Sequence, residues 1–182
     1  DPVSDIEVIQ TELCLADLST VDKTLARSTK QAKSGNDKEA ARLVAVLQKC
    51  HDALNQGKPV RAIDFSKEEL VVLKPLCLIT AKPAMFVGNV DENGFNNNPL
   101  LDKLKEYAAA QNAPVVAICA KMESEMAEMS DEDRAMFLQE MGQDEPGLNR
   151  LIRAGFSLLG LQTYFTAGVK EVRAWTVAIG AT

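Results

Sequence analysis

Two short polar segments, each directly after an apolar run, carry the residue types best suited to chemistry. Asn89 and Glu92 follow the run Ala84 to Val87, and Cys119-Ala120-Lys121 follows a second run that starts at Pro114. A carboxylate such as that of Glu92 accepts hydrogen bonds from two neighbouring N–H donors on one edge of a planar ring. The side-chain amide of Asn89 can brace adjacent loops. These residue types make the two segments a candidate ligand-binding site.

Two strands and a helix are expected to position these segments. Both apolar runs have the length and composition of buried strands, and the amphipathic pattern of residues 99–110 predicts a helix between them. A strand–helix–strand unit with short connections has a right-handed crossover and parallel strands. Ligands of such sheets lie beyond the carboxyl ends of the strands. We therefore expect an α/β fold with both polar segments at the same edge of the sheet.

The first polar segment is similar to the base-recognition motif of GTPases, with two departures. GTPases carry Asn-Lys-x-Asp at this strand end, where the acid accepts two hydrogen bonds from guanine, and the next strand ends in Ser-Ala-Lys. Here the acid is the longer Glu92, and Val90 stands in place of Lys. Because a displaced carboxylate no longer meets both guanine donors, we expect the guanine preference to be lost. Asn-x-x-Glu is also typical of an ordinary turn, and this alternative stays open.

The first third of the chain predicts a helical hairpin. Apolar residues recur at helical spacing over 4–33 and again over 38–56. Ser4 and Glu7 fit a capping box at the start, and Gly35 and Asp37 fit a helix end and the next N-cap. Two long helices joined by so short a turn pack antiparallel.

Positive charge gathers on this hairpin. Residues 19–58 carry a net charge of +4, whereas the whole chain carries −6. A basic segment on an acidic chain favours a polyanionic partner. The candidate ribosome- or RNA-binding residues lie near the tip: Lys30, Lys33, Lys38 and Arg42. A solvated helical face explains the same charges equally well.

The rest of the chain predicts further helices and a β-rich end. Helices are expected over 66–79, 130–141 and 146–159, and Pro75 inside the first is expected to kink it or delay its start. Ser66 and Ser130 are the expected N-caps of the first two. From Leu161 the alternation of residue types predicts two strands near a turn.

Composition excludes several classes of protein. His51 is the only histidine, which argues against His-based catalysis and His-rich metal sites. Four scattered cysteines without CxxC spacing indicate reduced thiols. No apolar stretch reaches 18 residues, and no leader precedes the first helix, so we expect a cytoplasmic protein without membrane contact. Residues 123–145 hold nine acids and one arginine, which argues against nucleic-acid binding there, and nothing points to DNA.

Several blocks of the sequence closely resemble the YchF proteins, the Obg-like ATPases of the translation-factor class of P-loop GTPases. The blocks are Asp5 to Ile9, Thr11 to Leu13, the Lys82-Pro83 to Glu92 segment, Glu145 to Arg150, Leu161 to Gly168 and Lys170 to Thr176. The resemblance implies the C-terminal part of a P-loop GTPase-like parallel-sheet domain (1–18 and 64–160). It also implies an inserted helical coiled-coil hairpin (19–63) and the start of a TGS domain (161–182).

The resemblance also implies an activity and a site. Members of this family bind ribosomes, use Mg²⁺ and hydrolyse ATP in preference to GTP. By this resemblance Asn89, Val90 and Glu92 contact the base, Val90 through its backbone. Cys119 and Ala120 stand where the Ser-Ala element would be, and Cys for Ser is a departure.

The phosphate-binding motif of the family is missing from this chain. There is no GxxxxGK[ST] sequence, so no phosphate cradle and no P-loop lysine. We expect a central fragment of a longer protein that keeps the base-recognition end, has no catalytic or metal-binding residues of its own and does not hydrolyse ATP alone. The alternative is a non-catalytic helical-hairpin module that binds a protein or RNA.

Overall fold

The computed structural model describes residues 1–35 and 38–181, which form two compact units, Asp1–Pro83 and Ala84–Thr182. The first unit holds three α-helices and three short 3₁₀ helices among its described residues. The second holds a parallel strand pair, four α-helices and an antiparallel strand pair, again among its described residues. None of the described helices is long and apolar enough to cross a membrane.

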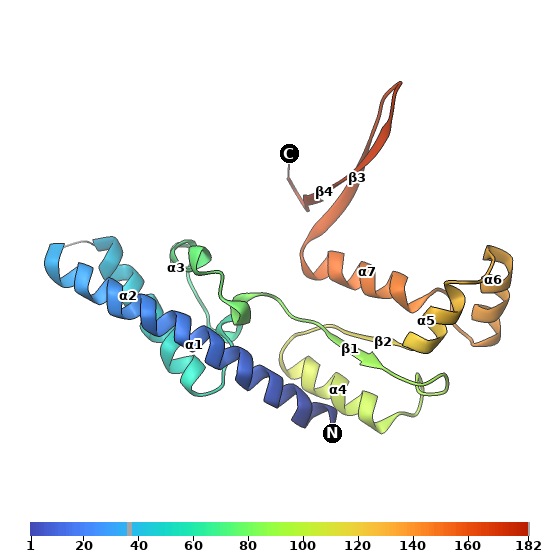
Figure 1. Ribbon diagram of the computed structural model, residues 1–182, viewed down its shortest axis with the longest axis horizontal. Helices are drawn as coiled ribbons and strands as arrows, with labels where there is room; N and C mark the ends of the chain where they lie inside the picture. The colour runs from blue at the N-terminus through green and yellow to red at the C-terminus, as the bar shows by residue number, and fades with distance from the viewer. Residues whose placement is uncertain (36–37, 182) are drawn as a thin grey trace. The chain divides into compact units, whose positions relative to one another are not determined.

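The first unit is built on two helices that lie side by side, α1 (Pro2–Gly35) and α2 (Lys38–Asn55) (Figure 1). The Gln10 amide near the start of α1 donates to the Gly57 carbonyl just after α2 at 3.3 Å. Farther along α1, Asp22 Oδ1 lies 3.5 Å from His51 Nε2. Because early residues of α1 contact late residues of α2, the two helices run antiparallel. That they form a coiled-coil insertion stays a prediction.

The ends of these helices differ in part from the expectation. Helix α1 begins at Pro2, so the predicted capping box at Ser4 and Glu7 is wrong. Asp1 Oδ1 accepts the Val3 N–H at 3.2 Å instead, and Pro at the first helical position needs no N–H partner. The turn with Asp37 as N-cap lies outside the described residues. Gly57, with a φ of 70°, follows α2 in the left-handed conformation that commonly ends a helix.

Apolar side chains and one acid fill the space between these helices and the segment that follows. The fully buried members of this core are Cys14, Val21, Val46, Leu47, Cys50 and Val60. Burial raises the pKa of the Cys50 thiol to about 11, so this thiol stays protonated. The buried Asp17 carboxylate accepts the N–H groups of Ile79 and Thr80 at 2.9 and 2.7 Å, and the Thr80 hydroxyl at 2.7 Å. Asp17 thereby ties the end of this unit to α1.

The third helix, α3, is shorter than predicted. It spans Lys67–Leu73. Ser66 is its N-cap, as expected, and forms a capping box with Glu69. Pro75 ends it, because proline offers no N–H to the turn behind it. The 3₁₀ helix η2 (Lys74–Leu76) follows. Two more 3₁₀ helices flank this region, η1 (Val60–Ala62) and η3 (Ile79–Ala81).

The second unit opens with the predicted parallel strands. Strands β1 (Phe86–Asn89) and β2 (Val115–Ile118) pair in parallel, and α4 (Pro99–Ala110) connects them. Strand β1 lies two residues later than expected, so Asn89 is its last residue rather than the first of the loop. A Cβ on Gly88 would lie 3.0 Å from Leu101 Cδ1, which shows how closely α4 approaches β1.

Three helices follow β2, and the sequence predicted two of them. Helix α5 (Ala120–Met126) was not predicted, whereas α6 (Asp131–Glu140) and α7 (Gly147–Leu158) were. Ser130 caps α6 as expected, by accepting the Asp133 N–H at 3.2 Å. A small hydrophobic core packs α5 against α6. It consists of Cys119, Met122, Met126 and Leu138.

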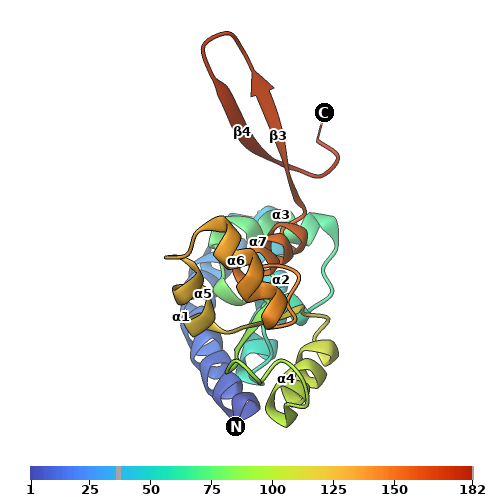
Figure 2. The same cartoon turned by 90° about the vertical axis from the view of Figure 1, so that its right-hand side faces the viewer.

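The second strand pair is exposed. Strands β3 (Leu161–Ala167) and β4 (Val172–Ala178) pair antiparallel, as predicted, and extend from the end of α7 (Figure 2). Nearly every residue of both strands is exposed, including Phe165 with 71% of its surface accessible. The expected domain boundaries after 18, 63 and 160 stay predictions.

Candidate functional site

The ends of β1 and β2 are joined by a side chain and by the backbone. Asn89 lies opposite Ile118 in the strand register. Its Oδ1 accepts the N–H of Ala120, the first residue of α5, at 3.0 Å. The Val90 N–H donates to the Ile118 carbonyl at 2.8 Å. Because both N–H groups are engaged, the Val90 backbone can offer a ligand its carbonyl oxygen only, and the Ala120 N–H would have to share its bond.

The loop after β1 is a tight turn. Asp91 Oδ1 accepts the Asn93 N–H at 3.1 Å, and the Asp91 carbonyl accepts the Gly94 N–H at 3.0 Å. A Cβ on Gly94 would lie 2.8 Å from Asp91 Oδ1 and 3.0 Å from Val90 Cβ, so the turn requires glycine here. Asn98 stabilises the end of the turn, because its Nδ2 donates to the Gly94 carbonyl at 2.9 Å. The turn fixes where Glu92 projects.

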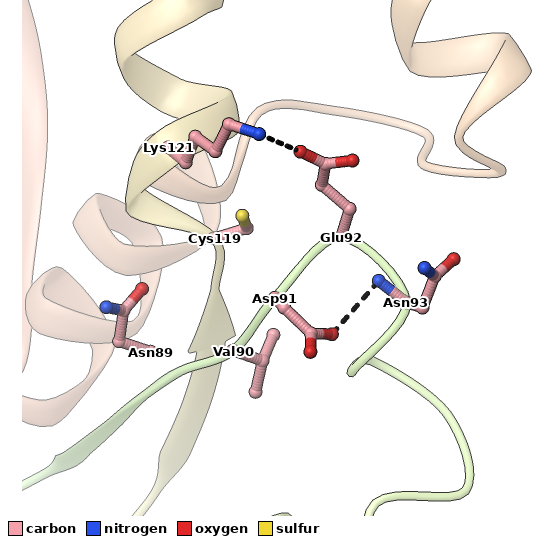
Figure 3. Close-up of a pocket in the computed structure, with 7 residues that line it drawn as sticks. All are labelled: Asn89, Val90, Asp91, Glu92, Asn93, Cys119 and Lys121. Atoms are coloured by element: carbon pink, nitrogen blue, oxygen red, sulfur yellow. Dashed lines mark hydrogen bonds and ion pairs between the residues drawn. The ribbon is translucent and has the colours of Figure 1, made fainter.

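Glu92 and Lys121 form an ion pair between the two strand ends. Lys121 Nζ donates to Glu92 Oε1 at 2.8 Å, and Figure 3 shows the two side chains pointing toward each other. Glu125 Oε1 lies farther from the same ammonium, at 4.0 Å. The hydrogen bond from Lys121 to Glu92 raises the pKa of Lys121, and the nearby charges of Glu92 and Glu125 add to this. The lysine is therefore charged at neutral pH, and the Glu92 carboxylate already has a donor.

These residues surround a pocket of about 540 Å³. The pocket is lined by Asn89, Val90, Asp91, Glu92, Asn93, Cys119 and Lys121 (Figure 3). A volume of this size suits a small organic ligand. The lining combines carboxylates, amides and one ammonium, which can hydrogen-bond the edge of a polar heterocycle.

Four of the five predicted base-site residues line this pocket: Asn89, Val90, Glu92 and Cys119. Ala120 contributes its N–H to Asn89 rather than a surface of the pocket. Cys119 is only 3% exposed, and its side chain packs in the core of Met122, Met126 and Leu138.

Sequence reasoning did not include Lys121, Asp91 or Asn93 among the site residues. The sequence did contain a signal for Lys121. Glu92 and Lys121 carry opposite charges and follow two strands that were expected to be adjacent.

Contacts among β2, α5 and α7 stabilise the strand ends that form the pocket. Glu123, on α5, accepts the Gly147 N–H at 2.6 Å and the Leu148 N–H at 3.2 Å, which caps α7. Arg150, on α7, donates to the Ala117 carbonyl of β2 at 3.1 Å. Its guanidinium also lies 5.7 Å from the ring centroid of Phe95, which follows the turn. These contacts hold β2, α5 and α7 together around the strand ends.

Comparison with known proteins identifies relatives along the whole chain. The chain is 53% identical over 182 residues to a protein named ribosome-binding ATPase YchF from Escherichia coli O157:H7, and 47% identical over 183 residues to the YchF of Bacillus subtilis. These alignments cover 100% and 99% of this chain and 50% of each relative. Among solved structures, the YchF GTPase of Schizosaccharomyces pombe superimposes with a TM-score of 0.87 at 27% identity, over 100% of this chain and 50% of that one.

This chain belongs to the YchF family. No protein-family model matches it. The chain spans about half the length of the curated relatives it matches. The α/β fold inferred from the strand–helix–strand pattern is confirmed by the likeness to the fission yeast YchF structure.

The basic residues of this YchF chain lie in the first unit, at the hairpin end where α1 finishes and α2 begins. Lys30, Lys33 and Lys38 are all exposed. The Arg42 guanidinium donates to Glu68 Oε2 at 2.6 Å, so an acid on α3 already compensates its charge. Of the four predicted residues, Arg42 is therefore the least available to a polyanion.

No metal-binding cluster was predicted in this chain. In the part of the chain that the structure describes, no group of three or more His, Cys, Asp or Glu side chains converges on a metal position. That this chain has no metal ligands stays a prediction, and so does the use of Mg²⁺ by the longer protein.

Proposed function

We propose that this chain is the base-binding part of a longer YchF protein that binds and hydrolyses ATP in preference to GTP. The observation that carries the proposal is the pocket at the ends of β1 and β2, where Glu92 is paired with Lys121. The names of the relatives support nucleotide hydrolysis but not one nucleotide, since the bacterial proteins are named ATPases and the fission yeast protein a GTPase.

In this proposal the residues of the pocket recognise the base and hold it in place. Asn89 keeps the two strand ends together through its bond to Ala120. The Val90 carbonyl is the free backbone acceptor for the 6-amino group of adenine, because the Val90 N–H is used by Ile118. The backbone at Cys119 closes the pocket beside α5. Binding energy gained at the base orients the phosphates for a reaction that occurs elsewhere.

The phosphate chemistry lies outside these residues. Bound Mg²⁺ would neutralise the phosphate oxygens during hydrolysis. Because the described residues contain neither a P-loop sequence nor a set of metal ligands, this chain by itself should not hydrolyse ATP.

The nucleotide preference is tested by rebuilding the GTPase motif. The double substitution Glu92→Asp with Val90→Lys in the full-length protein should shift the ratio of the ATP and GTP dissociation constants toward GTP by about tenfold or more, since a shorter carboxylate meets both guanine donors. Calorimetric titration with each nucleotide measures the ratio. The variant Asp102→Asn, on the exposed side of α4, is the control. An unchanged ratio in the double variant would contradict the proposed base recognition.

We further propose that the protein acts in the cytoplasm, where its nucleotide state regulates ribosome binding and the basic hairpin end contacts rRNA. The names of the bacterial relatives and the exposed charges of Lys33 and Lys38 support this. Reversing Lys30, Lys33, Lys38 and Arg42 to Glu should reduce co-sedimentation with ribosomes at low salt, because contacts to phosphate are electrostatic. Reversing four exposed lysines of the same unit elsewhere (Lys58, Lys67, Lys74 and Lys82) makes the same change in net charge. Equal losses in both variants would mean that only net charge matters.

A second function remains, a non-catalytic helical hairpin that binds a protein or RNA. The observation in its favour is that Asp1–Pro83 is a compact unit with its own core. Nucleotide binding by the full-length protein separates the two proposals.

A further inference from the structure

The ion pair of Glu92 and Lys121 joins the two loops that line the base pocket. Glu92 comes from the turn after β1 and Lys121 from the first turn of α5, and both side chains line the pocket. Both remain accessible, with 40% and 70% of their side-chain surface exposed. A base that enters the pocket therefore meets the pair as a unit, not a carboxylate alone.

A carboxylate in a base pocket favours whichever base satisfies it. Guanine presents two N–H donors on one edge, from N1 and the 2-amino group, which match the two carboxylate oxygens. When the Val90 carbonyl accepts its 6-amino group, adenine turns the lone pair of N1 and the C2–H group toward the carboxylate, and neither is an N–H donor. An acceptor that loses water and gains no donor weakens binding, so an unpaired Glu92 would disfavour adenine.

Lys121 changes this balance because it supplies the donor that adenine lacks. Its ammonium holds Glu92 Oε1 at 2.8 Å and has further N–H groups to offer. One of the two oxygens that guanine would need is therefore already engaged. The carboxylate is satisfied whichever base is bound.

We propose that Lys121 is a specificity-determining residue of this site, which makes the pocket tolerant of adenine by pairing with Glu92. The inference rests on the proposed function, since it assumes that the pocket holds the base of a nucleotide. It assigns the departure from guanine preference to two residues from different strand ends, not to the length of Glu92 alone.

The ion pair of Glu92 and Lys121 is not expected to stabilise the fold. An ion pair this exposed contributes little to folding, because solvent screens it and both side chains lose freedom. Replacing Lys121 should therefore leave the protein folded. The change is expected in the ratio of nucleotide affinities, which a purely structural role would not move.

The test is a double-mutant cycle in the full-length protein, with ATP and GTP as probes. Lys121→Met keeps an unbranched side chain that is one atom shorter and removes the ammonium donors. With Glu92 present, it should shift the ratio of the ATP and GTP dissociation constants about tenfold toward GTP, which is the size of one lost charge-assisted hydrogen bond. With Glu92→Gln, the same substitution should shift the ratio less than twofold, because no charged acceptor remains to be satisfied.

The control is Lys105→Met, which breaks an exposed ion pair with Asp102 on α4 and should leave the ratio unchanged. An equal shift in both backgrounds, or no shift in either, would overturn the role of Lys121 while leaving nucleotide binding established. A wild-type protein that binds neither nucleotide would overturn the proposed function and this inference together.

Discussion

The second unit contains two strand pairs, and each forms a two-stranded sheet. Helices cover the first pair, whereas the second pair is exposed. Strands β1 and β2 are mostly half-buried, with α4 close against β1 and Arg150 of α7 bonded to the Ala117 carbonyl of β2. Strands β3 and β4 are longer, yet nearly all of their residues are exposed. The cross-strand pair of Tyr164 and Trp175 and the bond from Trp175 Nε1 to Thr166 Oγ1 at 2.9 Å are local contacts.

This comparison shows that packing, not strand length, holds a pair together here. A two-stranded hairpin alone is marginally stable in water, and parallel strands need a crossover element to pair at all. The covered pair can therefore support a pocket whose parts must stay in place. The exposed pair depends on its own ladder and is expected to open more readily.

The largest loss of stability is expected when a side chain of α4 that packs against β1 is truncated. Leu104 is 5% exposed on the face of α4 toward β1. Leu104→Ala should lower the free energy of opening of β1 and β2 by about 3 kcal/mol, through lost burial and the cavity left behind. Hydrogen exchange of the strand amides in the 182-residue chain measures it. Lys105→Ala, one residue on and exposed, should change the same quantity by less than about 0.5 kcal/mol.

A smaller effect is expected from the cap that joins α5 to α7. Glu123→Ala removes the acceptor of the Gly147 and Leu148 N–H groups. We expect a loss of about 1.5 kcal/mol in the free energy of opening of α7, measured by exchange of its amides. Glu125→Ala on the same helix removes a side chain that lies 4.0 Å from Lys121, and it serves as the matched control. Equal protection in both variants would show that the cap is not what holds α7.

The smallest effect is expected on the exposed pair. Phe165 is 71% exposed on β3, so Phe165→Ser buries no new polar group and opens no cavity. Its effect on the thermal unfolding of the 182-residue chain should stay within about 0.5 kcal/mol. A loss as large as that of Leu104→Ala would contradict the inferred difference in packing between the two strand pairs.

Much of the local structure could be predicted because it depends on neighbours in the sequence. Short-range patterns predict the N-caps Ser66 and Ser130, the helix from Pro99 to Ala110 and the parallel strands. The predictions that failed also have local reasons. Helix α3 ends at Leu73, before the expected position, because Pro75 follows, and the start of α1 is capped by Asp1 rather than Ser4.

The sequence by itself placed Asn89, Val90, Glu92 and Cys119 at one edge of a sheet, because the carboxyl ends of parallel strands must meet there. Only the tertiary structure showed that Lys121 holds Glu92, that Asn89 holds Ala120 and that Arg42 is paired with Glu68. These partners are 29, 31 and 26 residues apart. No periodic pattern reports such pairs, because their distance depends on side-chain rotamers and on the turn that aims each residue.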